Sequence, residues 1–171
     1  MPDIIKGRAV VADDWIEVRL SAGQSPDIEL PSGKLIVPLE VWQSRREALL
    51  KREMRGVWLS DTDEPGDIAQ DLQHFRVVAI DFPKFVNGRG YSTAALLRTR
   101  YGYKGELRAI GDVLRDQMFY LERVGFNSFA VRPDQPMGEA LSALNDFSVA
   151  YQGSTSPAQP LFRRANRVAA N

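Results

Sequence analysis

Short apolar runs alternate with amphipathic segments along most of the chain. The apolar runs begin near residues 35, 57, 76, 106 and 128. Each run precedes a stretch whose apolar positions have helical spacing, and the starts lie roughly 20 to 30 residues apart. This order is typical of repeated βα units, in which helices cover a parallel sheet.

The individual elements follow from the same pattern. Residues 76–82, RVVAIDF, are almost continuously apolar, as expected of a strand that is buried on both faces. Apolar spacing and the turn residues between the runs predict the helices. Their expected ranges are 39–55, 63–75, 92–101, 112–124 and 134–147.

The number of units limits the possible architectures. Five βα units are too few for a closed eight-stranded barrel. They leave an open parallel sheet or a partial, half TIM-barrel-like sheet of about five strands, and the regular strand–helix order favours the partial barrel. Residues 8–20 are expected to form a β-hairpin that turns at Asp13-Asp14 and covers an open edge or the barrel bottom. Residues 1–150 therefore form one α/β domain, with its βα units in 34–148, and 151–171 form an extended tail.

Composition excludes several kinds of site. Lysines and arginines balance aspartates and glutamates at 22 each, without the basic excess that is typical of a general nucleic-acid binder. The chain has no cysteine, which excludes disulfides, a nucleophilic thiol and thiolate ligation of an iron–sulfur cluster. The single histidine, His74, provides no histidine cluster, so no metal site is expected. No apolar run is long enough for a signal peptide or membrane span, and we expect a cytoplasmic protein.

Ligands of parallel α/β proteins bind at the carboxyl ends of the strands, so the loops there are the candidate site. The longest one contains Asn87-Gly88-Arg89-Gly90-Tyr91-Ser92. Its glycines could bring backbone amides close to an anion at the following helix start, with Arg89 as a second contact. The loop departs from a dinucleotide fingerprint at Thr93, and no Walker A lysine follows. The alternative is a tight turn in which Ser92 caps the helix.

The next loop holds two carboxylates, Asp112 and Asp116. Asp112 could cap the helix that follows, or act as a base or ligand anchor at the strand end. Four residues apart on a helix, the two carboxylates would share one face, either for acid–base work or in ion pairs with neighbouring arginines such as Arg115. Gln117 lies one turn into the same helix.

Asp81 interrupts the strongest apolar strand. A buried carboxylate is costly unless it is paired, so Asp81 needs a cationic or hydrogen-bonding partner. Arg108, which interrupts the neighbouring strand, is the expected partner. The candidate anion contacts are thus Gly88, Arg89, Gly90, Tyr91, Ser92, Arg108 and Asp112, and the supporting residues are Asp81, Arg115, Asp116 and Gln117.

The segments GRGYS, LRTRYGY, GELRAIGDVLRDQ and RVGF between residues 88 and 126 resemble a bacterial family described as probable oxidoreductases involved in sulfite reduction. The genes of that family often lie beside the assimilatory sulfite reductase gene. The resemblance is strongest over residues 76–132 and continues upstream through LPSGKLIVPLEVW. It supplies no catalytic residues. The matching motif residues are Gly88, Arg89, Gly90, Tyr91, Ser92, Arg98, Arg108, Asp112, Arg115, Asp116 and Gln117.

Sulfite reduction needs siroheme and an iron–sulfur cluster, and a chain without cysteine cannot itself hold that cluster. The resemblance therefore implies an accessory of sulfur assimilation that contacts sulfite reductase or a related protein and binds an anion at the strand ends. Two alternatives stay open: an oxidoreductase-type enzyme with a dissociable flavin or nicotinamide cofactor, and an anion-binding regulatory domain. A homodimer is expected, without nucleic acid or membrane partners.

Overall fold

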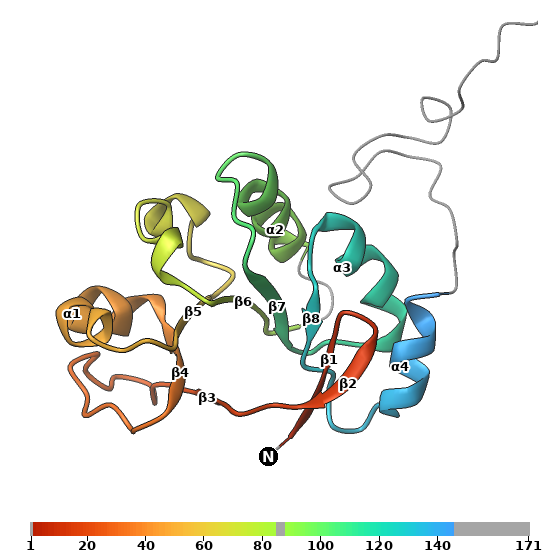
Figure 1. The fold of residues 1–171 in the computed structure, drawn as a ribbon, viewed down its shortest axis with the longest axis horizontal. Coiled ribbons are helices and arrows are strands. Elements are labelled where there is room, and N and C mark those ends of the chain that lie inside the picture. The colour runs from red at the N-terminus through yellow and green to blue at the C-terminus, as the bar shows by residue number, and fades with distance from the viewer. Residues whose placement is uncertain (1, 85–87, 146–171) are drawn as a thin grey trace, which may run out of the picture.

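The computed structural model describes residues 2–84 and 88–145. In these ranges, eight strands form one open, strongly curled half-barrel sheet in the order β2-β1-β8-β7-β6-β5-β4-β3, with the helices on its outer side (Figure 1). The predicted tail of residues 151–171 lies outside the described residues. The partial barrel of βα units is confirmed, but the expected strand number of about five is wrong.

The parallel part of the sheet runs from β3 to β8. Each strand after β3 is followed by helical structure, as the apolar pattern predicts. The elements in chain order are β4 (Lys34–Pro38), α1 (Leu39–Leu50), β5 (Arg55–Leu59), the 3₁₀ turns η1 (Pro65–Ile68) and η2 (Leu72–His74), β6 (Val77–Phe82), α2 (Arg89–Thr99), β7 (Glu106–Gly111), the 3₁₀ turn η3 (Arg115–Gln117), α3 (Met118–Val124), β8 (Ser128–Phe129) and α4 (Met137–Ala143).

The N-terminal region forms three strands, and the predicted hairpin over residues 8–20 is wrong. The hairpin consists of β1 (Asp3–Lys6) and β2 (Ala9–Ala12), which turn at Gly7 with a φ of 59°. β1 joins the sheet antiparallel to β8, whereas β3 (Trp15–Glu17) pairs with β4 at the opposite edge. Residues 13–14 therefore do not turn the chain back. They carry it from one edge of the half-barrel to the other. Residues 13–19, from this crossing through β3 to Arg19, are called the crossing segment below.

Several helices have different bounds from those that their patterns predict. Two 3₁₀ turns replace the helix expected over 63–75, because Asp63 folds back and accepts hydrogen bonds from the amide and hydroxyl of Ser60 at 2.7 and 2.8 Å. α3 begins at Met118, since the backbone of Leu114 is extended. α2 begins at Arg89, so Ser92 lies inside the helix and does not cap it.

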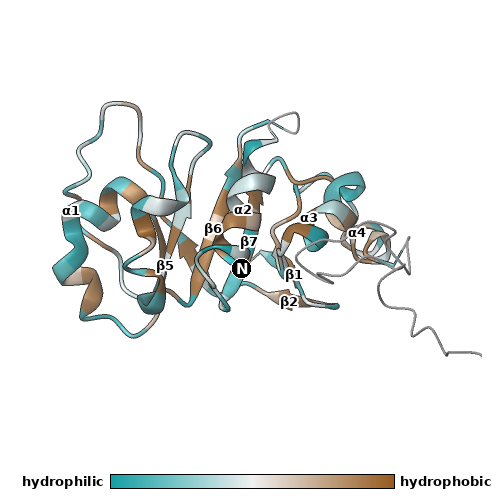
Figure 2. Cartoon of the chain, turned by 90° about the horizontal axis from the view of Figure 1, so that it is seen from above, coloured by the Kyte–Doolittle hydropathy of each residue, from teal (hydrophilic) through white to brown (hydrophobic). Residues whose placement is uncertain are grey.

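The two faces of the curled sheet have different interiors. On the outer face, alternate strand residues pack with the helices into one large apolar core, which includes Val57, Ile80, Phe82 and Leu107. On the inner face, a smaller cluster of Ile36, Val77, Ala79 and Ile110 packs with Trp15 and Trp58. Figure 2 shows the hydrophobic residues concentrated along the central strands.

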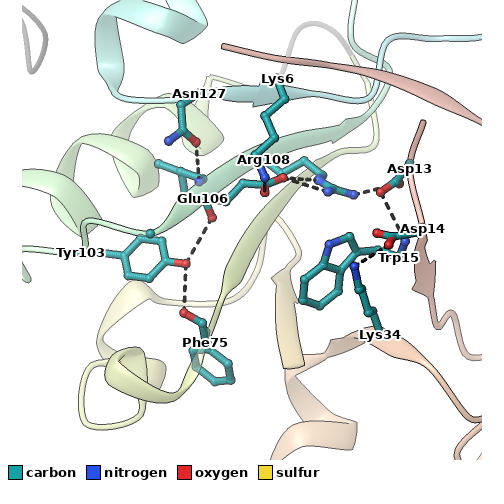
Figure 3. A network of polar contacts seen from close by, with 12 residues as sticks. Lys6, Asp13, Asp14, Trp15, Lys34, Phe75, Tyr103, Glu106, Arg108 and Asn127 are labelled. Atoms are coloured by element: carbon teal, nitrogen blue, oxygen red, sulfur yellow. Dashed lines mark hydrogen bonds and ion pairs between the residues drawn. The ribbon is translucent and has the colours of Figure 1, made fainter. Parts of the chain in front are cut away.

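Charged residues complete the inner face. Arg108 on β7 has a side chain that is 3% exposed. It donates to Glu106 at 2.8 and 3.0 Å and to Asp13 on the crossing segment at 2.9 Å (Figure 3). Lys6 on β1 reaches the other oxygen of Glu106 at 2.7 Å. This ion cluster of Lys6, Glu106, Arg108 and Asp13 therefore ties the crossing segment and the hairpin to the central sheet.

The ion cluster changes the titration of Glu106. Burial alone would raise the pKa of this carboxyl, but the ammonium of Lys6 and the guanidinium of Arg108 outweigh burial, and the net pKa is lowered. The carboxylate thus stays ionised in the folded protein at neutral pH. The two opposite charges of Glu106 and Arg108 are desolvated together, so removing one leaves the other buried without its main partner.

Replacing Arg108 by methionine is expected to lower the free energy of unfolding by about 3–5 kcal/mol, because Glu106 and Asp13 lose their shared cation inside the protein. Urea denaturation measures this change. The control is Arg45→Met, which breaks the exposed pair with Asp27 and should cost only about 0–1 kcal/mol. Equal effects of the two substitutions would contradict a structural role for the ion cluster.

The lowered pKa of Glu106 also predicts a pH dependence. As pH falls, Glu106 is protonated in the unfolded chain before it is protonated in the folded protein. Its contribution to the free energy of unfolding is therefore full above the pKa of glutamate in an unfolded chain, about 4.3, and is lost as pH falls through the lower pKa of the folded state. Urea unfolding from neutral to acid pH should show Glu106→Gln less stable than the unsubstituted protein at neutral pH. The difference should shrink in acid, and a constant difference would contradict the assignment.

Candidate functional site

An ion pair lies on the inner face at the carboxyl end of β6, between Asp81 of this strand and Arg19, which follows β3. The carboxylate of Asp81, whose side chain is 11% exposed, accepts hydrogen bonds from Arg19 at 2.8 and 3.4 Å. The guanidinium of Arg19 lies 4.9 Å from the ring centroid of Trp58 on β5, a cation–π arrangement, and also pairs with Glu17. About half of the Arg19 side chain is exposed, so this cation is both held in place and accessible.

The crossing segment, which carries Arg19, is held near both of its ends. At its start, Arg108 binds the carboxylate of Asp13, and near its end the indole N–H of Trp58 donates to the carbonyl of Val18 at 2.9 Å. The amide of Val18 also donates to the carbonyl of Ile36 on β4. The position of the Arg19 guanidinium therefore depends on the path of the crossing segment.

Gly111 at the end of β7 allows Asp81 to lie where it does. Its φ is +88°, and a Cβ there would lie 2.7 Å from the Asp81 carboxylate and 2.6 Å from the carbonyl of Phe82. A larger residue would therefore strain the backbone and displace the carboxylate that holds Arg19.

A second charged cluster lies at the ends of β7 and β8. Arg132 donates to Asp112 at 2.7 Å and to both oxygens of Asp134 at 2.5 and 2.8 Å. The prediction that Asp112 caps the following helix is wrong, because residues 113 and 114 separate it from η3 and its side chain binds Arg132 instead. The expected sharing of a helix face by Asp112 and Asp116 is wrong for the same reason.

The ion pairs keep these groups charged. Hydrogen bonding to Asp81 raises the pKa of Arg19, and hydrogen bonds to Asp134 and then Asp112 raise that of Arg132. In return, the Arg132 guanidinium lowers the pKa of Asp134. Each guanidinium has five N–H donors, and three of them bind carboxylates. The acceptors are Asp81 and Glu17 for Arg19, and Asp112 and Asp134 for Arg132. The remaining donors can bind a small anion, while the carboxylates fix their direction.

Asn87 of the predicted glycine loop lies outside the described residues, and residues 88–92 lie at the start of α2, on the outer side of the sheet. Arg89 is exposed at the start of α2 and pairs with Glu64. Gly90 is buried against Phe82, and the ring of Tyr91 lies edge-on to Phe82, at 5.5 Å between centroids. Gly88 precedes α2, and Ser92 is exposed within it. Gly90 and Tyr91 therefore dock α2 on the outer core.

Arg89 and Arg108 do not converge on one cleft, because they lie on opposite faces of the sheet. The expected pair of Arg108 with Asp81 is also wrong: Arg108 binds Glu106 and Asp13, and Asp81 binds Arg19. Ligand binding by the predicted residues stays a prediction.

The remaining predicted residues have local contacts. Arg115 lies 3.6 Å from the exposed Asp116. Gln117 accepts a hydrogen bond from the amide of Leu114 and is also hydrogen-bonded to the side chain of Tyr91, whose pKa is raised by burial. Gln117 thereby links η3 to α2 beneath the strand-end loops.

Arg98, a motif residue, has a clear structural role. Its guanidinium donates to the carbonyls of Tyr103, Gly105 and Gly125 at 2.7, 2.9 and 2.9 Å. It therefore joins the end of α2, the following turn and the end of α3 at the amino ends of the strands. The presence of Arg98 in the motif is therefore explained by its role in the fold, without a role in ligand binding or catalysis.

Five residues of the strand-end clusters are absent from the predicted set: Glu17, Arg19, Trp58, Arg132 and Asp134. The rule that sites lie at strand ends could have indicated Arg132, which directly follows the last predicted strand. Arg19 had no such signal, since it meets Asp81 across 62 positions of sequence.

Nowhere in residues 2–84 and 88–145 do three or more His, Asp or Glu side chains gather in a way that could hold a metal ion. Within the same ranges, no helix has the length and apolar character needed to cross a membrane. The charged clusters are thus built from arginine–carboxylate pairs.

Comparison with known proteins gives one family. The model of a family described as a bacterial protein of unknown function, DUF934, matches residues 56–162. The match covers Asp81, Asp112 and Arg132 and begins after the crossing segment that carries Arg19. No curated protein and no solved structure matches the chain.

The two glycines of the predicted loop give a matched pair of substitutions. Gly90→Ala would place a Cβ 2.7 Å from the ring of Phe82, which is 1% exposed, and should lower the free energy of unfolding by about 1–3 kcal/mol. Gly88→Ala meets no atom within 4 Å and should be nearly neutral. Thermal or urea unfolding compares them, and a neutral Gly90→Ala would contradict the close approach of α2 to the sheet.

Proposed function

The chain belongs to this bacterial family of unknown function, and we propose that it is an accessory protein of sulfite reduction, which binds a small oxyanion at the strand ends and acts through contact with a partner protein. The accessory role rests on the resemblance of residues 88–126 to proteins encoded near assimilatory sulfite reductase, together with the absence of cysteine. The partner is sulfite reductase or another protein of sulfur assimilation.

The observation that carries the anion-binding part is the geometry of Arg19. Its guanidinium is stacked on Trp58 and held by Asp81, yet about half of the side chain is exposed. A guanidinium offers paired N–H donors that match the oxygens of an oxyanion such as sulfite or sulfate. Because its orientation is already fixed, binding costs less side-chain entropy than it would for a free arginine.

Arg132 supports the same proposal. It lies at the strand end in a similar arrangement, with two carboxylates as partners and part of its side chain exposed. Its two carboxylate partners more than offset the charge of the guanidinium, so an anion would bind weakly and reversibly, through the remaining N–H donors. Reversible binding suits a protein that hands an anion to a partner.

The proposal predicts a growth defect. A strain that lacks the gene should grow poorly on sulfate or sulfite as sole sulfur source and normally on cysteine. The gene with Arg19→Gln should restore growth only partly, because the anion loses its oriented donor, whereas Arg45→Gln on α1 should restore it fully. Growth rates of the complemented strains measure the effect.

Calorimetry with the purified protein separates the parts of the proposal. Sulfite or sulfate should bind, and Arg19→Gln should weaken binding about tenfold or more. Normal growth of the deletion strain on sulfate would overturn the accessory role. Absence of binding by either anion would overturn the anion site, and saturable binding of a flavin or nicotinamide would favour the enzyme alternative.

A further inference from the structure

The strand β2 lies at one edge of the sheet and pairs only with β1 among the described strands. All four of its residues, Ala9–Ala12, are exposed. Val10 and Val11 are 42% and 36% exposed, and the strand contains neither a charged residue nor a proline. Natural sheets usually protect an edge with such residues, because a bare edge pairs readily with another strand.

The hydrogen bonds show which backbone groups face outward. The amide of Asp13 donates to the carbonyl of Pro2 at 2.8 Å, so residues 13, 11 and 9 point toward β1. The amide of Gly7 donates instead to the carbonyl of Asn127, the residue directly before β8, in agreement with this alternation. The amides and carbonyls of Val10 and Ala12 therefore point away from the sheet.

We propose that the free edge of β2 binds β2 of a second copy of this chain, antiparallel and around a two-fold axis at Val11. In this register Val10 pairs with Ala12 of the partner subunit, and Ala12 with Val10 of the partner subunit. Each of these two pairs exchanges two backbone hydrogen bonds, so the outward amides and carbonyls are satisfied. The two Val11 side chains meet across the axis on the inner face.

Charge complementarity selects this register. It places Arg8 opposite Asp14 of the partner subunit, and the symmetric contact repeats at the other end. Both side chains are about half exposed and lie directly beside the strand, so they can reach across. A two-fold axis at Val10 would also satisfy the backbone, but it places Arg8 opposite an alanine and forms no ion pair.

Each side chain already has a partner within its own chain. Arg8 donates to Glu122 and Asn145, and Asp14 accepts from Lys34. The contacts of Arg8 hold it beside β2, which reduces the entropy that the intersubunit pair must overcome. Asp14 exchanges Lys34 on β4 for Arg8 of the partner subunit. The pairing would join two half-barrels into one continuous sheet.

A charge swap between two variants tests the interface. The unsubstituted protein should sediment as a dimer. Arg8→Glu places two carboxylates together at each end of the interface, Asp14→Arg places two cations together, and each should weaken dimerisation about tenfold or more. A mixture of the two variants should form dimers again. In each mixed dimer the introduced glutamate faces the introduced arginine at one end, and the native pair of Arg8 with Asp14 is kept at the other.

Two further variants keep the result interpretable. Val10→Pro removes an outward N–H but no bond to β1, so it should abolish the dimer while circular dichroism shows a folded chain. Ile16→Lys on β3, at the opposite edge, is equally exposed in its native form and should leave the dimer intact. A monomeric unsubstituted protein, or a dimer unaffected by both charge variants and by Val10→Pro, would overturn the proposal.

Discussion

The buried ion cluster around Arg108 holds the separate parts of the fold in their relative positions. Its central cation, Arg108, comes from the middle of the sheet, a second cation, Lys6, comes from β1, and its carboxylates come from β7 and from the segment that crosses the open side. The contact with Arg108 fixes Asp13, and with it the start of the crossing segment, against the inner face. The cost of desolvating these charges is large, so their value lies more in specifying the path of the chain than in added stability.

That path determines the candidate site. A chain that turned back at Asp13-Asp14 would leave the strand ends of β5 and β6 without the cation that Arg19 provides. Because the chain instead continues to β3, Arg19 reaches Asp81 and stacks on Trp58. The inner face thus carries two charged clusters. The one around Arg108 on β7 is buried, and the one formed by Arg19 and Asp81 at the end of β6 is accessible. Only the accessible cluster is available to a ligand.

The βα region was predictable because its signals are local. Each strand is a short apolar run, and each helix shows its spacing in a single segment, so five units follow from the sequence, in a partial barrel or an open sheet, with the partial barrel favoured. The N-terminal strands were harder to predict. Two aspartates in sequence look like a turn, and only their partners Arg108 and Lys34, far along the chain, show that the segment is extended.

The site was predictable only in part, for a similar reason. The requirement that Asp81 have a partner was correct, but sequence could not choose among the arginines. Arg108 was the nearest in the sheet, yet it lies opposite Ala79 and is closer to Glu106 on its own strand. Asp112 had the local appearance of a helix cap, and its true partner, Arg132, is 20 positions away.

Hydrogen–deuterium exchange on Arg108→Met tests the central role of this cluster most directly. If Arg108 fixes the crossing segment, amides of residues 13–20 should lose protection while those of β5 and β6 keep theirs. The exchange is followed by mass spectrometry under native conditions. A uniform loss across the sheet, or unchanged protection of residues 13–20, would contradict the account.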